Sequence, residues 1–200
     1  MILAASSCWR YDLVLDDASP ARAGCRDVAN RMRFAYADPP YPGQARRHYK
    51  MPEVDHRKLL QQLCTFDAWA LSTSSPALKD LLPLCPPRTR IAAWVKPFAF
   101  FKPKVWPAYA WEPVLYFGAR WSRYRKTPMD WVLAKPKGMT PAERATLTCK
   151  GAKPPEFAAW LFELLGLTKA DEFHDLFPGT GAVTKAWEQW RTRENPASTM

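Results

Sequence analysis

Prolines are spread along this chain and limit the length of its helices and strands. Twenty prolines stand among 200 residues with only eight glycines. No repeat period appears, which excludes solenoid and collagen-like arrays. The prolines separate short apolar runs with strand character from amphipathic stretches with helix character. This alternation is typical of an α/β protein built around a sheet.

Five apolar runs predict strands, at 32–37, 67–73, 90–95, 112–118 and 171–177. Shorter helices are predicted after Pro52 and after Ser75, where proline suits the first turn. The clearest helix precedes Gly166, a typical helix end, and has apolar side chains at i, i+3, i+4, i+7 and i+8: Phe157, Trp160, Leu161, Leu164 and Leu165. A last helix places four apolar residues on one face: Val183, Ala186, Trp187 and Trp190.

Length and composition indicate a single soluble domain over 1–200. The hydrophobic share of 48% beside 24% charged residues is normal for a packed protein, and no apolar run has the ~18 residues of a membrane-spanning helix. The N-terminus has no basic region followed by a long apolar stretch, so no secretory signal is expected. The five cysteines are scattered without CxxC spacing, which favours reduced thiols in the cytoplasm.

The net charge of +10, together with 10 tryptophans and 7 tyrosines, favours a polyanionic partner that stacks, such as a nucleic acid. The segment 96–111 mixes proline, lysine and aromatics and is predicted to be an ordered surface loop; 119–150 is basic and has little apolar periodicity. Both are expected to face the nucleic acid. The alternative for any one cation is a solvated surface charge. The candidate contacts are Lys102, Lys104, Trp106, Tyr109, Arg120, Arg123, Arg125 and Lys126.

The turn Asp38-Pro39-Pro40-Tyr41 follows the first predicted strand. Its prolines fix the backbone and supply carbonyl acceptors without amide donors. Acceptors are what an exocyclic amino group needs, and the aromatic face of Tyr41 can stack on a base taken out of its helix. The alternative is a plain strand-ending turn with a capping aspartate.

A second turn, 175–181, links the last predicted strand to the last helix. Gly179 and Gly181 let the backbone approach a ligand closely, next to a helix N-terminus. Open α/β sheets bind ligands at the carboxyl ends of strands, where both turns are expected. The alternative for this second turn is an ordinary tight turn.

Together the two turns resemble those of the S-adenosylmethionine-dependent amino-methyltransferases of DNA. Asp38-Pro39-Pro40-Tyr41 looks like the catalytic tetrapeptide, 175–181 looks like the cofactor turn, and 151–154 resembles the segment that closes over the methionine portion of the cofactor. The motif order is that of the circularly permuted members. Over 32–190 the resemblance implies a Rossmann-like methyltransferase fold, a mostly parallel sheet with helices on both faces, and the last strand beside the one ending in Asp38.

The resemblance also implies roles for single residues. The Asp38 carboxylate and the Pro39 carbonyl would hold the target amino group beside Pro40, and Tyr41 would stack on the flipped base. Aspartate rather than serine at position 38 favours adenine over cytosine. The cofactor S-adenosylmethionine would be bound by Asp175, Phe177, Pro178, Gly179, Thr180 and Gly181, with Lys153 and Pro154.

In this family an acid after the last helix binds the cofactor ribose, and here Asp16 or Asp17 is the candidate replacement; otherwise the sheet is trimmed. No metal is expected, because the three histidines lack ligand spacing. Two alternatives remain open. One is a non-catalytic module that binds nucleic acid on a methyltransferase scaffold, and the other is methylation of cytosine or of RNA adenine.

Overall fold

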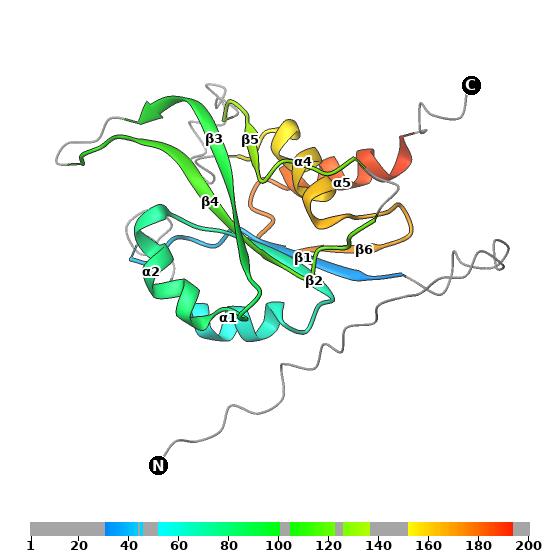
Figure 1. Ribbon diagram of the computed structural model, residues 1–200, viewed down its shortest axis with the longest axis horizontal. Helices are drawn as coiled ribbons and strands as arrows, with labels where there is room; N and C mark the ends of the chain where they lie inside the picture. The colour runs from blue at the N-terminus through cyan, green and yellow to red at the C-terminus, as the bar shows by residue number, and fades with distance from the viewer. Residues whose placement is uncertain are drawn as a thin grey trace, which may run out of the picture.

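The computed structural model describes residues 31–43, 45, 52–100, 105–122, 126–136 and 152–193, which form one sheet with helices on both faces (Figure 1). The strands are β1 (Arg33–Ala37), β2 (Ala68–Ser72), β3 (Arg90–Phe100), β4 (Tyr109–Phe117), β5 (Trp131–Leu133) and β6 (Glu172–Asp175). The α-helices are α1 (His56–Leu63), α2 (Leu78–Leu81), α4 (Pro155–Leu165) and α5 (Ala182–Thr192). Two 3-10 helices, η2 (Ser75–Ala77) and η3 (Leu82–Leu84), flank α2.

The six strands lie in the order β5-β3-β4-β2-β1-β6. β1 pairs in parallel with β2 and with β6, and β3 pairs in parallel with β5. Of these six described strands, β4 alone runs the other way, because it is antiparallel to both of its neighbours. The structure thus confirms the predicted α/β class, the mostly parallel sheet and the position of the last strand beside β1.

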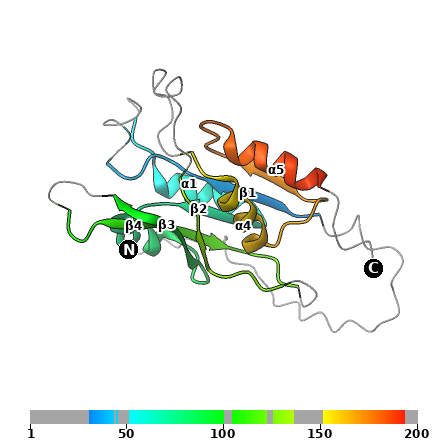
Figure 2. The ribbon, with the colours of Figure 1, turned by 90° about the horizontal axis from the view of Figure 1, so that it is seen from above.

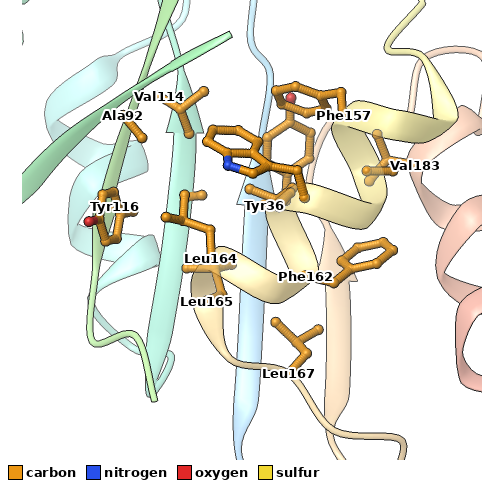
Figure 3. Close-up of a cluster of buried hydrophobic side chains, with 14 of the residues drawn as sticks. Tyr36, Ala92, Val114, Tyr116, Phe157, Phe162, Leu164, Leu165, Leu167 and Val183 are labelled. Carbon is orange, nitrogen blue, oxygen red and sulfur yellow. The ribbon is translucent and has the colours of Figure 1, made fainter. Parts of the chain in front are cut away.

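The two faces of the sheet bury alternate residues of the same strands, as the period of a strand requires. In β1, Phe34 and Tyr36 pack under α4 and α5, whereas Ala35 and Ala37 pack over α1 and α2. Figure 3 shows side chains of α4 gathered against Tyr36 and other strand residues. In Figure 1, α4 and α5 lie above the strands and α1 and α2 lie below them, and Figure 2 views the same layers from the side of α4 and α5. Helices on both faces are therefore confirmed.

α4 has the predicted apolar face and the predicted end. Gly166 follows it with a φ of 74°, in the left-handed region that suits glycine at this position. A Cβ at Gly166 would lie 2.3 Å from the backbone oxygen of Arg120. Glycine is therefore required both by the backbone conformation and by the close approach of the chain after β4.

The prediction of a loop over 96–111 is wrong in part. β3 continues to Phe100 and β4 begins at Tyr109, so both ends of this segment are strands of an extended hairpin. Pro97 misled the prediction because prolines normally end strands. It lies where the register shifts between Val95 and Phe100, and proline is tolerated at such irregularities.

β5 lies inside the segment 119–150, where no strand was predicted. Its apolar pattern is weak because it is an edge strand whose Trp131 and Leu133 are 43% and 56% exposed. Val132 and Ala134 point to the other face and join the cluster under α4. No helix in the described part of the chain combines the length and apolar character needed to cross a membrane.

Candidate active site at the carboxyl edge of the sheet

The Asp38-Pro39-Pro40-Tyr41 segment leaves the sheet at the carboxyl end of β1. Pro39 is buried, and 26% of the Asp38 side chain remains exposed. β2, β3 and β6 run in the same direction as β1, so their carboxyl ends share this edge. The helices that follow β1 and β6 cover opposite faces. Asp38 therefore lies at a topological switch point, where open α/β sheets bind ligands.

Lys153 joins Asp38 to a second carboxylate at this edge. Its Nζ lies 3.1 Å from Asp38 Oδ1 and 3.2 Å from Glu112 Oε2, and only 5% of its side chain is exposed. It also lies 4.9 Å from the ring centroid of Trp94 and 5.6 Å from that of Phe157, within the range of cation–π attraction. Burial opposes its charge, but the two carboxylates outweigh burial and raise the pKa of Lys153. Lys153 is a buried cation shared between two acids.

Glu112 is the centre of the charged cluster, although the sequence indicated only that it begins a strand. Its Oε1 accepts a hydrogen bond from Lys96, and its Oε2 accepts one from the Tyr41 hydroxyl at 2.8 Å as well as from Lys153. Lys96 Nζ lies 5.0 Å from the Trp94 ring centroid. Burial alone would raise the pKa of Glu112, but Lys153 and Lys96 outweigh it and lower the pKa to about 2.

Glu112 and Lys96 are two members of the site that were not predicted from the sequence. The signal was a charged residue inside an apolar strand pattern. Both residues stand in such runs, Glu112 between Trp111 and Pro113, and Lys96 directly after Val95. A charge in a strand of a buried sheet needs a partner, because an unpaired charge is costly to bury.

Burial changes the pKa values of the titratable side chains in the Asp38-Pro39-Pro40-Tyr41 segment. It raises the pKa of Asp38, with the Glu112 charge adding to the effect and Lys153 opposing it. It also holds the pKa of Tyr41 well above its ordinary value, helped by the Asp38 and Glu112 carboxylates. Tyr41 is thus neutral at physiological pH, and its hydroxyl donates a hydrogen bond to Glu112. The arrangement offers a hydrogen-bond acceptor at Asp38 beside an aromatic ring fixed by its hydroxyl.

The glycine turn lies next to Asp38 in space. Leu176 N donates to Tyr36 O at 2.8 Å, so the turn after β6 starts beside the end of β1. Within the turn, Asp175 accepts hydrogen bonds from Phe177 N at 3.3 Å and from Thr184 Oγ1 at 3.1 Å. Burial raises the pKa of Asp175, with a smaller contribution from the Asp38 charge. The two predicted motifs are therefore brought together, and Asp175 ties the turn to α5.

The same turn presents open backbone. Gly179 and Gly181 have φ values of 51° and 72°, and a Cβ built on Gly181 would meet nothing within 4 Å. Residues 178–180 are exposed. Gly181 caps α5 without a side-chain hydrogen bond, which leaves first-turn amides for a polar ligand. The open space at Gly181 and the backbone donors of α5 fit the cofactor that the resemblance implies. Lys153, which precedes Pro154, lies beside Asp38 at the same edge of the sheet.

Of the residues predicted to contact nucleic acid, some lie at the surface, some lie outside the described part of the chain, and Arg120 is mostly buried. Trp106 is 95% exposed, Tyr109 is partly buried at the start of β4, and Lys126 is exposed. Figure 1 shows the β3–β4 hairpin extending past the other strands on the side where β1 ends. Some of the predicted contacts and both ribose candidates lie outside the described residues: Lys102, Lys104, Arg123, Arg125, Asp16 and Asp17.

Arg120, which was predicted to contact nucleic acid, is instead paired with Asp171. Its Nη1 and Nη2 donate to the two oxygens of Asp171 at 2.6 and 2.8 Å, and only 15% of the Arg120 side chain is exposed. Arg120 follows β4, the one reversed strand, and Asp171 precedes β6. The pair therefore lies at the amino edge of the sheet, away from Asp38. The basic residues around Arg120 predicted a contact with nucleic acid, whereas its mostly buried guanidinium forms an ion pair with Asp171.

No family model and no curated protein matches this chain. Among solved structures, the chain is similar to the crystal structure of the M1.HpyAVI-SAM complex, with a TM-score of 0.41 and 11% sequence identity over 78% of this chain and 89% of that chain. A similarity at this level carries no function from one chain to another. The proposed function therefore rests on this chain's own residues.

Proposed function

We propose that the chain transfers a methyl group from S-adenosylmethionine to the exocyclic amino nitrogen of adenine in DNA. The observation that carries this proposal is the proximity of its two motifs. An acceptor-rich Asp38-Pro39-Pro40-Tyr41 segment and an open glycine turn leave adjacent parallel strands, with Tyr36 directly paired to Asp175. Each motif alone has an ordinary structural explanation. Their meeting at one switch point favours a shared reaction centre.

The cofactor is proposed to lie on the glycine turn. Gly179 and Gly181 permit its close approach, Phe177 and the backbone of Pro178 and Thr180 border it, and Asp175 keeps the turn in shape. Lys153 and Pro154 would face it from the segment before α4. When bound, S-adenosylmethionine supplies an electrophilic methyl group, so this chain's task is positioning and exclusion of water.

The target amine is proposed to bind at Asp38. Its carboxylate and the Pro39 carbonyl would accept hydrogen bonds from the two N–H groups of the amine, which directs the nitrogen lone pair toward the methyl carbon. As the nitrogen–carbon bond forms, the electron pair of the carbon–sulfur bond stays on sulfur, and the nitrogen gives up a proton toward solvent beside Asp38. Pro40 fixes the backbone between these acceptors and Tyr41, whose ring would stack on the base. Adenine is favoured over cytosine through the resemblance at position 38.

The β3–β4 hairpin is proposed as the main DNA contact. It stands at the same edge as Asp38, and Trp106 is almost fully exposed there. Lys102 and Lys104 lie in the same hairpin in sequence, and Tyr109 stands at its base. Cations bind phosphates, while an exposed aromatic stacks on bases or fills the space of a flipped one. Arg123, Arg125 and Lys126 remain candidates for phosphate contacts.

One observation favours a second candidate, a non-catalytic module that binds nucleic acid. Lys153 already donates to Asp38, so the proposed acceptor of the target amine has a partner within the chain. The exposed fraction of Asp38 leaves room for a second donor, which is why the enzyme is preferred. A module of this kind would bind DNA equally with and without S-adenosylmethionine.

The test uses the full chain, tritiated S-adenosylmethionine and DNA from a host without adenine or cytosine methylation. The expected product after nuclease digestion is N6-methyladenine. Asp38→Asn keeps the side-chain shape and should reduce the rate by roughly 10²- to 10³-fold, the typical cost of losing one positioned polar group. Methylated cytosine, or label in RNA alone, would redirect the substrate. No label in any nucleic acid, with DNA binding intact, would replace the enzyme by the second candidate.

A further inference from the structure

The carboxylate of Glu112 gathers three donors from three separate parts of the chain. Lys96 comes from β3, Tyr41 from the segment after β1, and Lys153 from the segment before α4. Only 19% of the Glu112 side chain is exposed. The register places Glu112 opposite Trp94, over whose ring both lysine ammonium groups lie. This carboxylate therefore connects the hairpin to both ends of the catalytic segment.

We propose that Glu112 is a positioning residue for the methyl transfer described above. It acts on Tyr41 directly, by holding the hydroxyl and so the plane of the ring. It acts on Asp38 through Lys153, whose ammonium it shares. The inference rests on the proposed function, and it adds a residue on β4 to which that function assigns no contact with the cofactor or the target amine.

The charge of Glu112 matters for Asp38 because one ammonium lies between two carboxylates. With Glu112 ionised, Lys153 divides its donors between the two acids, which leaves acceptor capacity on Asp38 for an amine. With Glu112 neutral, Asp38 is the remaining anion within reach of Lys153 among the described residues. The ammonium is then drawn to Asp38 and competes with the target amine. Loss of the Glu112 charge should therefore lower kcat.

The hydroxyl contact predicts a different kinetic effect. Tyr41 contributes its ring to base stacking, and its hydrogen bond to Glu112 restricts the rotation of that ring. A ring free to rotate loses entropy when the base binds, so the KM for DNA should rise. Glu112 thus influences kcat through Lys153 and KM through Tyr41, and these two effects are separable by mutation.

The experiment measures kcat and KM for DNA in wild type, Glu112→Gln, Tyr41→Phe and the double variant. Glu112→Gln should lower kcat about 10- to 100-fold, the usual cost of a small displacement of reacting groups, and raise KM. Tyr41→Phe should raise KM more than it lowers kcat. In the Tyr41→Phe background, Glu112→Gln should lower kcat again without raising KM further. The matched control is Glu172→Gln on β6, which removes an exposed ion pair with Arg31 and should leave kcat and KM at their wild-type values.

A readout independent of activity is the nuclear magnetic resonance signal of lysine ammonium groups, which exchange slowly only when buried and paired. Wild type should show signals from Lys96 and Lys153. Glu112→Gln should broaden both, and Asp38→Asn should affect that of Lys153 alone. Additive effects of the two substitutions on the KM for DNA, or a Glu112→Gln variant with wild-type kcat, would overturn the inference while leaving the proposed function intact. An inactive wild type would overturn the proposed function instead.

If Glu112→Gln does not fold, Tyr41→Phe still decides the part of the inference that concerns the ring. This variant removes one hydroxyl and keeps the ring. An unchanged KM for DNA would overturn the inference, whereas a raised KM with the S-adenosylmethionine affinity of wild type would support it.

Discussion

The two edges of the sheet each hold an aspartate paired with a cation, and the two pairs differ in burial and in hydrogen bonding. At the amino edge, Asp171 is fully enclosed and accepts five hydrogen bonds, from both Arg120 nitrogens, Met32 N, Thr168 N and Thr168 Oγ1. At the carboxyl edge, Asp38 is partly exposed and has one ion-pair partner among the described residues, Lys153. A saturated carboxylate stabilises a fold, whereas an unsaturated one keeps acceptor capacity for a ligand.

The largest expected effect tests this difference in stability. Asp171→Asn replaces an acceptor by an amide that faces Arg120 and leaves a mostly buried guanidinium without its counter-charge. Removing one partner of such a pair costs about 3 to 5 kcal/mol. Asp38→Asn should cost about 1 kcal/mol or less, because Lys153 keeps Glu112. Urea denaturation of both variants measures the two changes, and equal losses would remove the distinction between the edges.

The pH dependence of stability should differ in sign between the two aspartates. Hydrogen bonds outweigh burial and lower the pKa of Asp171 in the folded chain. Its contribution is therefore present above its unfolded pKa of about 3.9 and is lost as the pH falls through the lower folded pKa. Burial raises the pKa of Asp38, so its contribution is present below about pH 3.9 and is lost as the pH rises through the folded pKa.

Urea denaturation of wild type and of each aspartate-to-asparagine variant, between about pH 3 and 6, measures how the free energy of unfolding changes with pH. The stability deficit of Asp171→Asn should shrink toward acid. The free energy of unfolding of Asp38→Asn should rise relative to that of wild type as the pH rises. Parallel curves for the two variants would show that the two carboxyl groups titrate alike, contrary to the difference in their surroundings.

The smallest expected effect compares two exposed tryptophans. Trp106 belongs to the hairpin on the Asp38 side, and Trp121, which is 80% exposed, follows β4 at the other edge. Trp106→Ala should weaken DNA binding by about 1 kcal/mol, or roughly fivefold, the lower end of base-stacking energies. Trp121→Ala is the matched control and should bind as wild type. Fluorescence anisotropy with labelled duplex measures both, and a larger loss at Trp121 would move the DNA surface to the amino edge.

The parts of this account that the sequence predicted are local. The strand before Asp38, the amphipathic face of α4 and the left-handed Gly166 follow from residue spacing and short-range sterics. The meeting of Asp38 with the glycine turn came from the family resemblance, and the pairing of β1 with β6 confirms that adjacency. The assigned roles of these residues stay predictions.

The parts that were missed depend on pairing between distant strands. Glu112 reaches Lys96 because β3 and β4 form a long hairpin whose register the sequence does not determine. Arg120 finds Asp171 across 51 positions, so a local count of cations could not separate it from solvated neighbours. In both cases the partner of a charge was decided by the tertiary fold.

The central claim is that the carboxyl edge binds S-adenosylmethionine on the glycine turn. Calorimetric titration of the full chain with S-adenosylmethionine, and with its demethylated product, tests this most directly. Binding to wild type is expected, with loss of binding in Gly179→Asp, whose side chain and charge would occupy the turn, and retention in Glu172→Gln. The absence of binding to wild type, with DNA present and without it, would contradict the account.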